Sequence, residues 1–224
     1  MENFGIYLAL CLIASVTFAV EWPFGTYTLV KPISGCPPGW WEGWTFQDNE
    51  DSHNSNQMPI GGHHFAGSFG RNMQFYYCTK NPNLGINGGL WPRGNYCILQ
   101  HGESCPIGFQ PGTVHWDDED SRNTNSHGGV LPTGSYGRNT DINYCCRDDG
   151  QFNASISLPT SRPFYLLRFT SLCQMVKGMY VREEAVHFDD EDHHNGNSAS
   201  GKHPLGTGGG RNQELMYCYY SHLR

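Results

Sequence analysis

Apolar and polar residues alternate in three segments of the chain that share one closing pattern, G-R-N-x-x-apolar-x-Y-C. A period of two places the apolar residue and the tyrosine of each copy on one face of an extended segment. These pairs are Phe75 with Tyr77, Ile142 with Tyr144, and Leu215 with Tyr217. The Gly-Arg-Asn ahead of each pair favours a turn. We therefore expect core strands here, and no long run repeats apolar residues at helical spacing.

A second pattern, D-[DN]-E-D-x-x-N-x-N, precedes each closing pattern. Its copies begin at Asp48, Asp117 and Asp189. Two patterns in the same order in three places indicate one repeated unit, over residues 22–78, 91–147 and 159–220. The connections are short, so we expect a single all-β domain over residues 20–224, with three units of short strands around a pseudo-threefold axis.

The chain opens with an apolar stretch from Ile6 to Phe18 that ends in the small-residue pattern Thr17-Phe18-Ala19. This pattern is typical of a secretory signal peptide, which we place at residues 1–19. The stretch is too short to span a bilayer, which takes about 20 apolar residues, and no later segment qualifies. We expect a secreted, extracellular protein without a membrane span.

Composition narrows the choice of partners. The formal net charge is −7, with 21 acidic against 14 basic residues, so no basic surface is available to neutralise phosphates. Nucleic acid is therefore not an expected partner. Glycine, proline and aromatic residues are abundant, as short strands joined by turns require.

The chain has nine cysteines, of which Cys11 lies in the predicted signal peptide. An even set in an exported protein predicts disulfides. Each unit has an early and a late cysteine, and the second unit has one further pair. Symmetry favours Cys36 with Cys78, Cys105 with Cys145, Cys173 with Cys218, and Cys97 with Cys146. Pairing between neighbouring units would satisfy the same symmetry, so this alternative stays open.

The acidic runs need compensation because neighbouring carboxylates repel one another. Their candidate residues are Asp48, Glu50, Asp51, Asn54, Asp117, Glu119, Asp120, Asn123, Asp189, Glu191, Asp192 and Asn195. Our preferred interpretation is structural. Arg71, Arg138 and Arg211 of the Gly-Arg-Asn turns would each pair with a carboxylate of their own unit, while the asparagines cap backbone groups.

Two other interpretations of the runs stay open. Calcium prefers clustered carboxylates and amide carbonyls, although His53, Arg122 and His194 stand where an EF-hand loop has glycine. We predict no cofactor and no dedicated metal site, with calcium as the alternative. In the other interpretation, the loops face a ligand and accept hydrogen bonds from sugar hydroxyls or peptide amides. Asn153 opens the glycosylation sequon Asn-Ala-Ser.

The chain resembles the apextrin C-terminal (ApeC) domain over residues 22–224. The likeness rests on the repeated Trp-Pro-x-Gly-x-Tyr at Trp22 and Trp91, the acidic runs with their asparagine pairs, the segment from Pro163 to Arg168, and the closing Tyr-Cys-Tyr-Tyr at Tyr217. The resemblance implies a secreted invertebrate protein linked to innate immunity through binding of bacterial peptidoglycan and muropeptides. It assigns no individual ligand contacts.

We therefore expect a secreted binding module whose partner is bacterial cell-wall glycan or peptidoglycan. An extracellular-matrix protein with extracellular protein partners is the alternative, and a cell-wall glycan hydrolase a distant one. We do not expect an enzyme and assign no catalytic residue, because the usual motifs of serine hydrolases and zinc proteases are absent from the sequence. Repeated equivalent surfaces also suit multivalent binding better than a single catalytic site.

Overall fold

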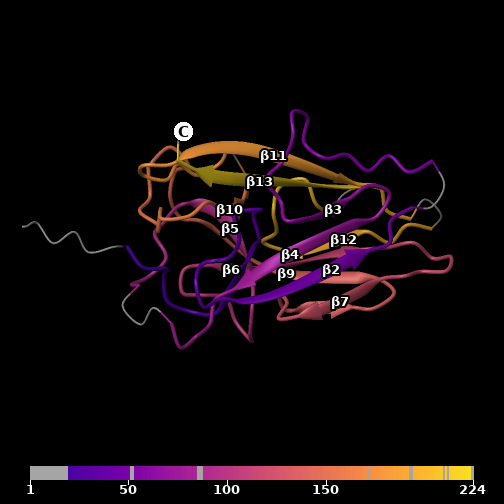
Figure 1. Cartoon of the computed structure of the whole chain (residues 1–224), viewed down its shortest axis with the longest axis horizontal. Helices are drawn as coiled ribbons and strands as arrows, with labels where there is room; N and C mark the ends of the chain where they lie inside the picture. The colour runs from indigo at the N-terminus through magenta and orange to yellow at the C-terminus, as the bar shows by residue number, and fades with distance from the viewer. Residues whose placement is uncertain are drawn as a thin grey trace, which may run out of the picture.

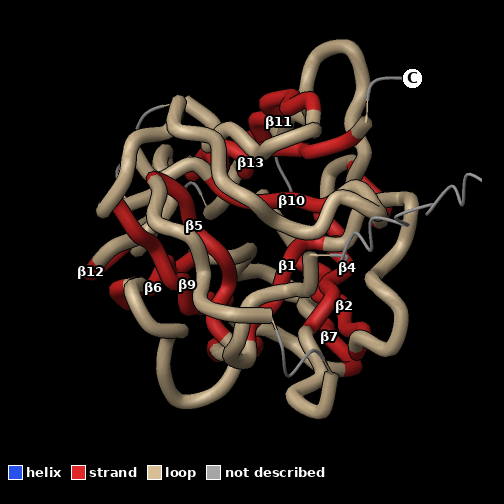
Figure 2. The backbone as a smooth tube through the Cα atoms, turned by 90° about the vertical axis from the view of Figure 1, so that its left-hand side faces the viewer, coloured by secondary structure: helices blue, strands red, loops and turns tan. Residues whose placement is uncertain are grey.

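The computed structural model describes residues 20–50, 53–84, 88–170, 172–191, 194–208, 210 and 212–222. Within these residues the chain is all-β, as predicted, and none of them forms a helix, so none could cross a membrane as one (Figures 1 and 2). The strands are β1 (Tyr27–Val30), β2 (Trp41–Gln47), β3 (Gly67–Phe69), β4 (Met73–Thr79), β5 (Asn95–Gln100), β6 (Gln110–Trp116), β7 (Ser126–Gly129), β8 (Gly134–Tyr136), β9 (Thr140–Asp148), β10 (Phe164–Leu167), β11 (Tyr180–Phe188), β12 (Ser198–Gly201) and β13 (Gln213–Ser221).

Three segments of the chain use the same strand pairing. We call residues 22–78, 91–147 and 159–220 the first, second and third segments. In each of them the last strand pairs antiparallel with the first and with the long second strand. The pairs are β4 with β1 and β2, β9 with β5 and β6, and β13 with β10 and β11. The closing patterns of the sequence thus form the central strand of each segment.

Strands from neighbouring segments join these three parts into one sheet of 13 strands. Strand β7 pairs with β2, and β12 pairs with β6. Where a strand joins the other pairs of segments, the described residues of the first and third segments form one isolated β-bridge, between Gln57 and His187 of β11. Strand β5 also pairs with both β1 and β10. Each segment therefore contributes a strand or a residue that pairs with a long strand of another segment, and the three segments share one sheet.

Two hydrophobic clusters lie on opposite sides of the first strands. Val30 of β1 packs in one cluster with Tyr77, Tyr144 and Tyr217, which are all buried. Leu29, the preceding residue of β1, packs in the other cluster. Strands β1, β5 and β10 are therefore covered on both faces, which explains why they are nearly continuous apolar runs rather than alternating ones.

Four disulfides link the closing strands β4, β9 and β13 to earlier parts of their own segments. They are Cys36–Cys78, Cys97–Cys146, Cys105–Cys145 and Cys173–Cys218. These are the pairs that the sequence favours, within segments rather than between neighbours. They close loops of 40 to 49 residues. The chain-entropy model gives each such loop about 4 kcal/mol of stabilisation.

The join between the first and third segments differs from the other two. At one register position on the closing strands, β2 and β6 have Gly43 and Gly112, where an added Cβ would lie 2.2 and 2.1 Å from a backbone oxygen. Strand β11 has Glu184 there. Its fully buried carboxylate contacts His64 Nδ1 at 2.6 Å and accepts a hydrogen bond from Tyr165. Side-chain contacts thus replace a backbone ladder at this join.

Candidate functional site

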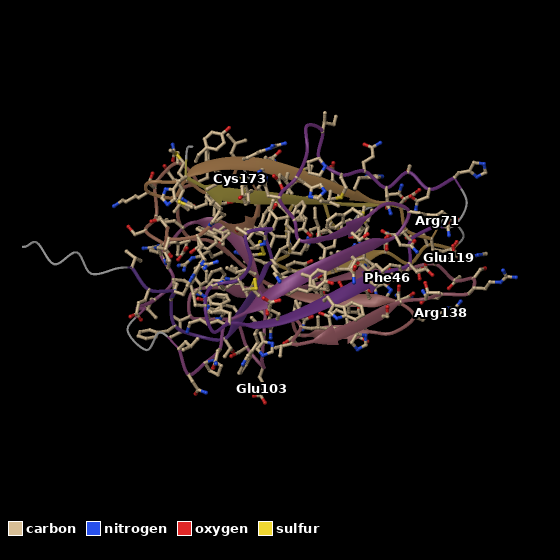
Figure 3. The ribbon with its side chains drawn as sticks, viewed as in Figure 1. Phe46, Arg71, Glu103, Glu119, Arg138 and Cys173 are labelled. Carbon is tan, nitrogen blue, oxygen red and sulfur yellow. A yellow bond between two sulfur atoms is a disulfide. The ribbon has the colours of Figure 1, made fainter. Side chains whose placement is uncertain are left out.

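The three acidic runs meet at the end of the sheet opposite Cys173 (Figure 3). Each run begins directly after a long strand, β2, β6 or β11. Backbone hydrogen bonds link the runs in a ring: Glu50 donates to Asp189, Glu119 to Asp48, and Glu191 to Asp117, at 2.9 to 3.0 Å. We call residues 48–50, 117–120 and 189–191 the acidic cap.

The first acid of each run ties one segment to the next. Asp48 accepts hydrogen bonds of 2.8 Å from both the backbone nitrogen and the hydroxyl of Thr124. Asp117 accepts one of 2.6 Å from the backbone nitrogen of Gly196. Asp189 accepts one from the backbone of Ser55. Backbone N–H groups, a hydroxyl and side-chain amides therefore donate to these carboxylates.

The second position of each run is fully buried. Asp118 accepts hydrogen bonds from Thr140 at 2.6 Å, Asn125 at 2.7 Å and Gln47 at 3.3 Å. Burial nevertheless raises the pKa of Asp118 to about 7. Burial, and then the neighbouring charge of Asp118, raise the pKa of Asp190 well above its ordinary value.

The first segment has Asn49 at this second position, and its amide donates to Asp190 at 3.3 Å. An amide therefore stands where a third buried carboxylate would otherwise add to the repulsion. The cap thus brings together two acids that hold their protons more tightly than usual and one neutral donor.

The third position brings Glu50, Glu119 and Glu191 together. All three are buried, and one carboxylate oxygen from each lies within 4.8 Å of the others. Glu119 also accepts a hydrogen bond from the backbone of Ser121, and Glu191 one from Asp120. Three oxygens at this spacing could supply part of the six to eight ligands that calcium takes.

The first asparagine after the acids in each repeated pattern closes the turn that follows them. Asn54, Asn123 and Asn195 donate to the carbonyls of Glu50, Glu119 and Glu191 at 2.9, 2.8 and 2.6 Å. The residues just before these asparagines adopt a left-handed backbone, with φ of 59° at His53, 56° at Arg122 and 59° at His194. Sequence reasoning did not anticipate left-handed turns here, because histidine and arginine rarely adopt them. The hydrogen bonds from Asn54, Asn123 and Asn195, which we call the asparagine clamps, hold these turns in place.

The two described arginines of the Gly-Arg-Asn turns, Arg71 and Arg138, are exposed at the rim of the cap. The guanidinium of Arg138 lies 2.6 Å from Asp120, and the two side chains are 62% and 52% exposed. The carbonyl of Arg71 accepts hydrogen bonds from Asn54 and Asn56. Amide, hydroxyl and backbone donors therefore surround the buried acids. The remaining predicted positions, Asp51, Asp192 and Arg211, lie outside the described residues.

Two hollows of similar composition flank the cap, and we call them the arginine hollows. The first, of about 550 Å³, is lined by Asn54, Asn56, Met58, Phe69, Gly70, Arg71 and Met73. The second, of about 590 Å³, is lined by Asn123, Asn125, Ser126, His127, Tyr136, Gly137 and Arg138. Arg71 and Arg138 lie at the same end of the molecule as Glu119 (Figure 3). Each hollow thus presents one guanidinium and one aromatic ring.

Asn153 of the sequon is exposed in a turn after β9. Its neighbour Ala154 donates to the carbonyl of Gln151 at 3.1 Å. The side chain is therefore accessible to a modifying enzyme, and glycosylation stays a prediction.

Comparison with known proteins gives one match. A family model described as the C-terminal domain of apextrin, ApeC, matches residues 22–220. Neither the curated proteins nor the solved structures contain a match to the chain.

Proposed function

The chain belongs to the family of apextrin C-terminal domains, and we propose on this basis that it is a secreted module that binds microbial cell-wall material, peptidoglycan or its muropeptides, in innate immunity. The signal peptide lies outside the described residues, so secretion is part of the proposal. Four disulfides support it, because disulfides persist in oxidising compartments.

The pair of arginine hollows is the observation that carries this proposal. Peptidoglycan combines sugar rings with peptide carboxylates. Phe69 and Tyr136, half-buried against the core, line the hollows and supply aromatic carbon for a sugar to pack on. Arg71 and Arg138 line the same hollows and would bind a carboxylate. A ligand carboxylate can displace Asp120 from Arg138 at little expense, because an exposed ion pair contributes only about 0–1 kcal/mol.

The domain is proposed to consist of three repeats around one pseudo-threefold axis. The recurring strand pairs and the ring of backbone hydrogen bonds in the acidic cap support this arrangement. Repeats related in this way would present the arginine hollows to neighbouring positions of one polymer. Two weak contacts on one polymer bind more tightly than either alone, since the second contact forms at high effective concentration.

An assay with insoluble peptidoglycan tests the proposal. The wild-type protein should pellet with it, and the double variant Arg71→Ala/Arg138→Ala should bind at least about tenfold more weakly, since two charge-assisted contacts are lost. The matched control is Arg93→Ala, which removes an exposed arginine whose partner is Asp149.

The same assay separates the alternatives. A wild-type protein that stays in the supernatant contradicts peptidoglycan binding and favours the matrix function. Sugar released into the supernatant instead supports a cell-wall hydrolase. Binding that survives in the double variant would keep the function but remove the arginine hollows as its site.

A further inference from the structure

Three neighbouring strands carry a serine, a histidine and an aspartate side by side. The register pairs Ser198 of β12 with His115 of β6, and His115 with Asp141 of β9. Directly paired residues on antiparallel strands project to the same face of a sheet. The three side chains therefore form a row with the histidine in the middle, and all three line one hollow of about 640 Å³. We call these residues the Ser-His-Asp row.

The aspartate orients the histidine. Nδ1 of His115 lies 2.7 Å from Oδ1 of Asp141. A carboxylate at this distance holds the proton on Nδ1, which leaves the lone pair on Nε2. The side chains of His115 and Asp141 are 29% and 37% exposed, and Ser198 is exposed, so a substrate can reach the row. The contact with Asp141 orients the imidazole, and the strand register places the Ser198 hydroxyl on its other side.

A second row lies two residues further along the same strands. It consists of Ser200, Thr113 and Asn143, and the Thr113 hydroxyl donates to the amide oxygen of Asn143 at 2.9 Å. This contact uses the oxygen of Asn143 and leaves its NH₂ group to donate. Strand β6 separates Asn143 from Ser198, so this amide lies outside the Ser-His-Asp row.

The sheet does not require a serine, a histidine and an aspartate at these register positions. The same register positions in the other two joins hold different residues: Ser126, Phe46 and Gln74 in one, and Gln57, His187 and Glu214 in the other. Phenylalanine at the histidine position shows that the sheet forms without an imidazole there. Among these three rows, one alone combines a hydroxyl nucleophile, a base and an acid.

We propose that the Ser-His-Asp row hydrolyses carboxylic esters, an activity separate from cell-wall binding. Ser198 Oγ bonds to the ester carbonyl carbon while its proton passes to Nε2 of His115. The alcohol then leaves with that proton, and the acyl group stays on Ser198. Water attacks the acyl carbon, gives one proton to His115 and releases the acid, and the proton returns to Ser198. Ester and water thus become acid and alcohol.

An ester is the substrate class that fits this open site. An alkoxide leaves more readily than an amide anion, so ester cleavage requires less stabilisation of the transition state than amide cleavage does. Asp141 touches no reacting atom in this scheme and is a positioning residue.

A fluorophosphonate probe, which labels activated serines, tests the proposal on the intact secreted protein. Peptide mapping should find the label on Ser198. His115→Phe should abolish labelling while keeping the wild-type melting temperature, because Phe46 occupies the matching position. Ser126→Ala, in a row without histidine, should label like wild type.

Turnover of p-nitrophenyl acetate gives the second readout. We expect kcat/KM to fall by about 100-fold or more in Ser198→Ala and in His115→Phe. Asp141→Asn should lower it as well, and Asp141→Glu should keep it, since glutamate occupies the matching position at Glu214. Absence of label from Ser198, or labelling and turnover that survive in His115→Phe, would overturn the proposal.

Discussion

Replacing Asp118 by asparagine should stabilise the protein at neutral and alkaline pH. The side chain of Asp118 is fully buried, and burial raises its pKa from 3.8 to about 7. A carboxyl group with a raised pKa in the folded state contributes stability that is present below pH 4 and is lost as the pH rises through 7. The wild-type protein should therefore lose stability between these two values, in a way that the variant does not.

The size of the expected change in stability follows from the pKa shift of Asp118. Each unit of pKa corresponds to about 1.4 kcal/mol, so the stability of the variant relative to wild type should rise by about 4 kcal/mol between pH 4 and pH 8. Asp190 titrates together with Asp118, which spreads the change over a wider pH range. The amide can keep the contacts. Its oxygen accepts from Thr140 and Asn125, and Gln47 presents its own oxygen after a flip.

Equilibrium unfolding in urea, with disulfides intact and at several pH values, measures this difference. Asp120→Asn is the matched control, because Asp120 belongs to the same acidic run but is exposed; its effect should stay below about 1 kcal/mol at every pH. A stability difference between Asp118→Asn and wild type that does not change with pH would refute the reasoning.

Three further substitutions test other parts of the structure. Arg138→Ala should lower the free energy of unfolding by less than about 1 kcal/mol in urea titrations, since its ion pair is exposed; a loss of 2 kcal/mol or more would mean that it compensates buried acids. Glu184→Ala should lower the same quantity by about 3 kcal/mol, because buried donors lose their acceptor; an unchanged midpoint contradicts this. Gly43→Ala should lower the melting temperature clearly, whereas Gly70→Ala, which meets nothing within 4 Å, should leave it nearly unchanged.

The all-β class and the disulfide pairs could be predicted because both follow from repetition. Three copies of an alternating pattern mark Tyr77, Tyr144 and Tyr217 as core residues, and the structure buries all three. One early and one late cysteine per copy leave two symmetric patterns, and the structure has the bonds within segments rather than those between neighbours. Both inferences need only local order along the chain, which a sequence displays directly.

The compensation of the acidic runs could be predicted only in part. Arg138 pairs with Asp120 of its own segment, as expected, but the donors to the buried acids could not be predicted. Arginine stands out in sequence as the opposite charge, yet Asp48 is held by the backbone and hydroxyl of Thr124 in another segment. Backbone donors look alike at every position, so a sequence does not reveal which of them meets a given carboxylate. The left-handed turns at His53 and Arg122 are hidden for a related reason, since they depend on asparagine clamps rather than on the turning residue.

The positions at which the three segments differ are the better guide to specific chemistry. What they share, such as the asparagine clamps and the ring of backbone bonds through the acidic cap, serves folding in all three places. Residues that differ between the segments do not take part in this shared folding role. Glu184 breaks the shared pattern where Gly43 would let two backbones meet. The Ser-His-Asp row breaks it as a combination, because His187 at the matching position of the third segment pairs with Gln57 rather than with a serine. Since the fold tolerates Phe46 or His187 at that register position, it does not require a serine, a histidine and an aspartate in one row; their combination needs another explanation, and catalysis supplies one.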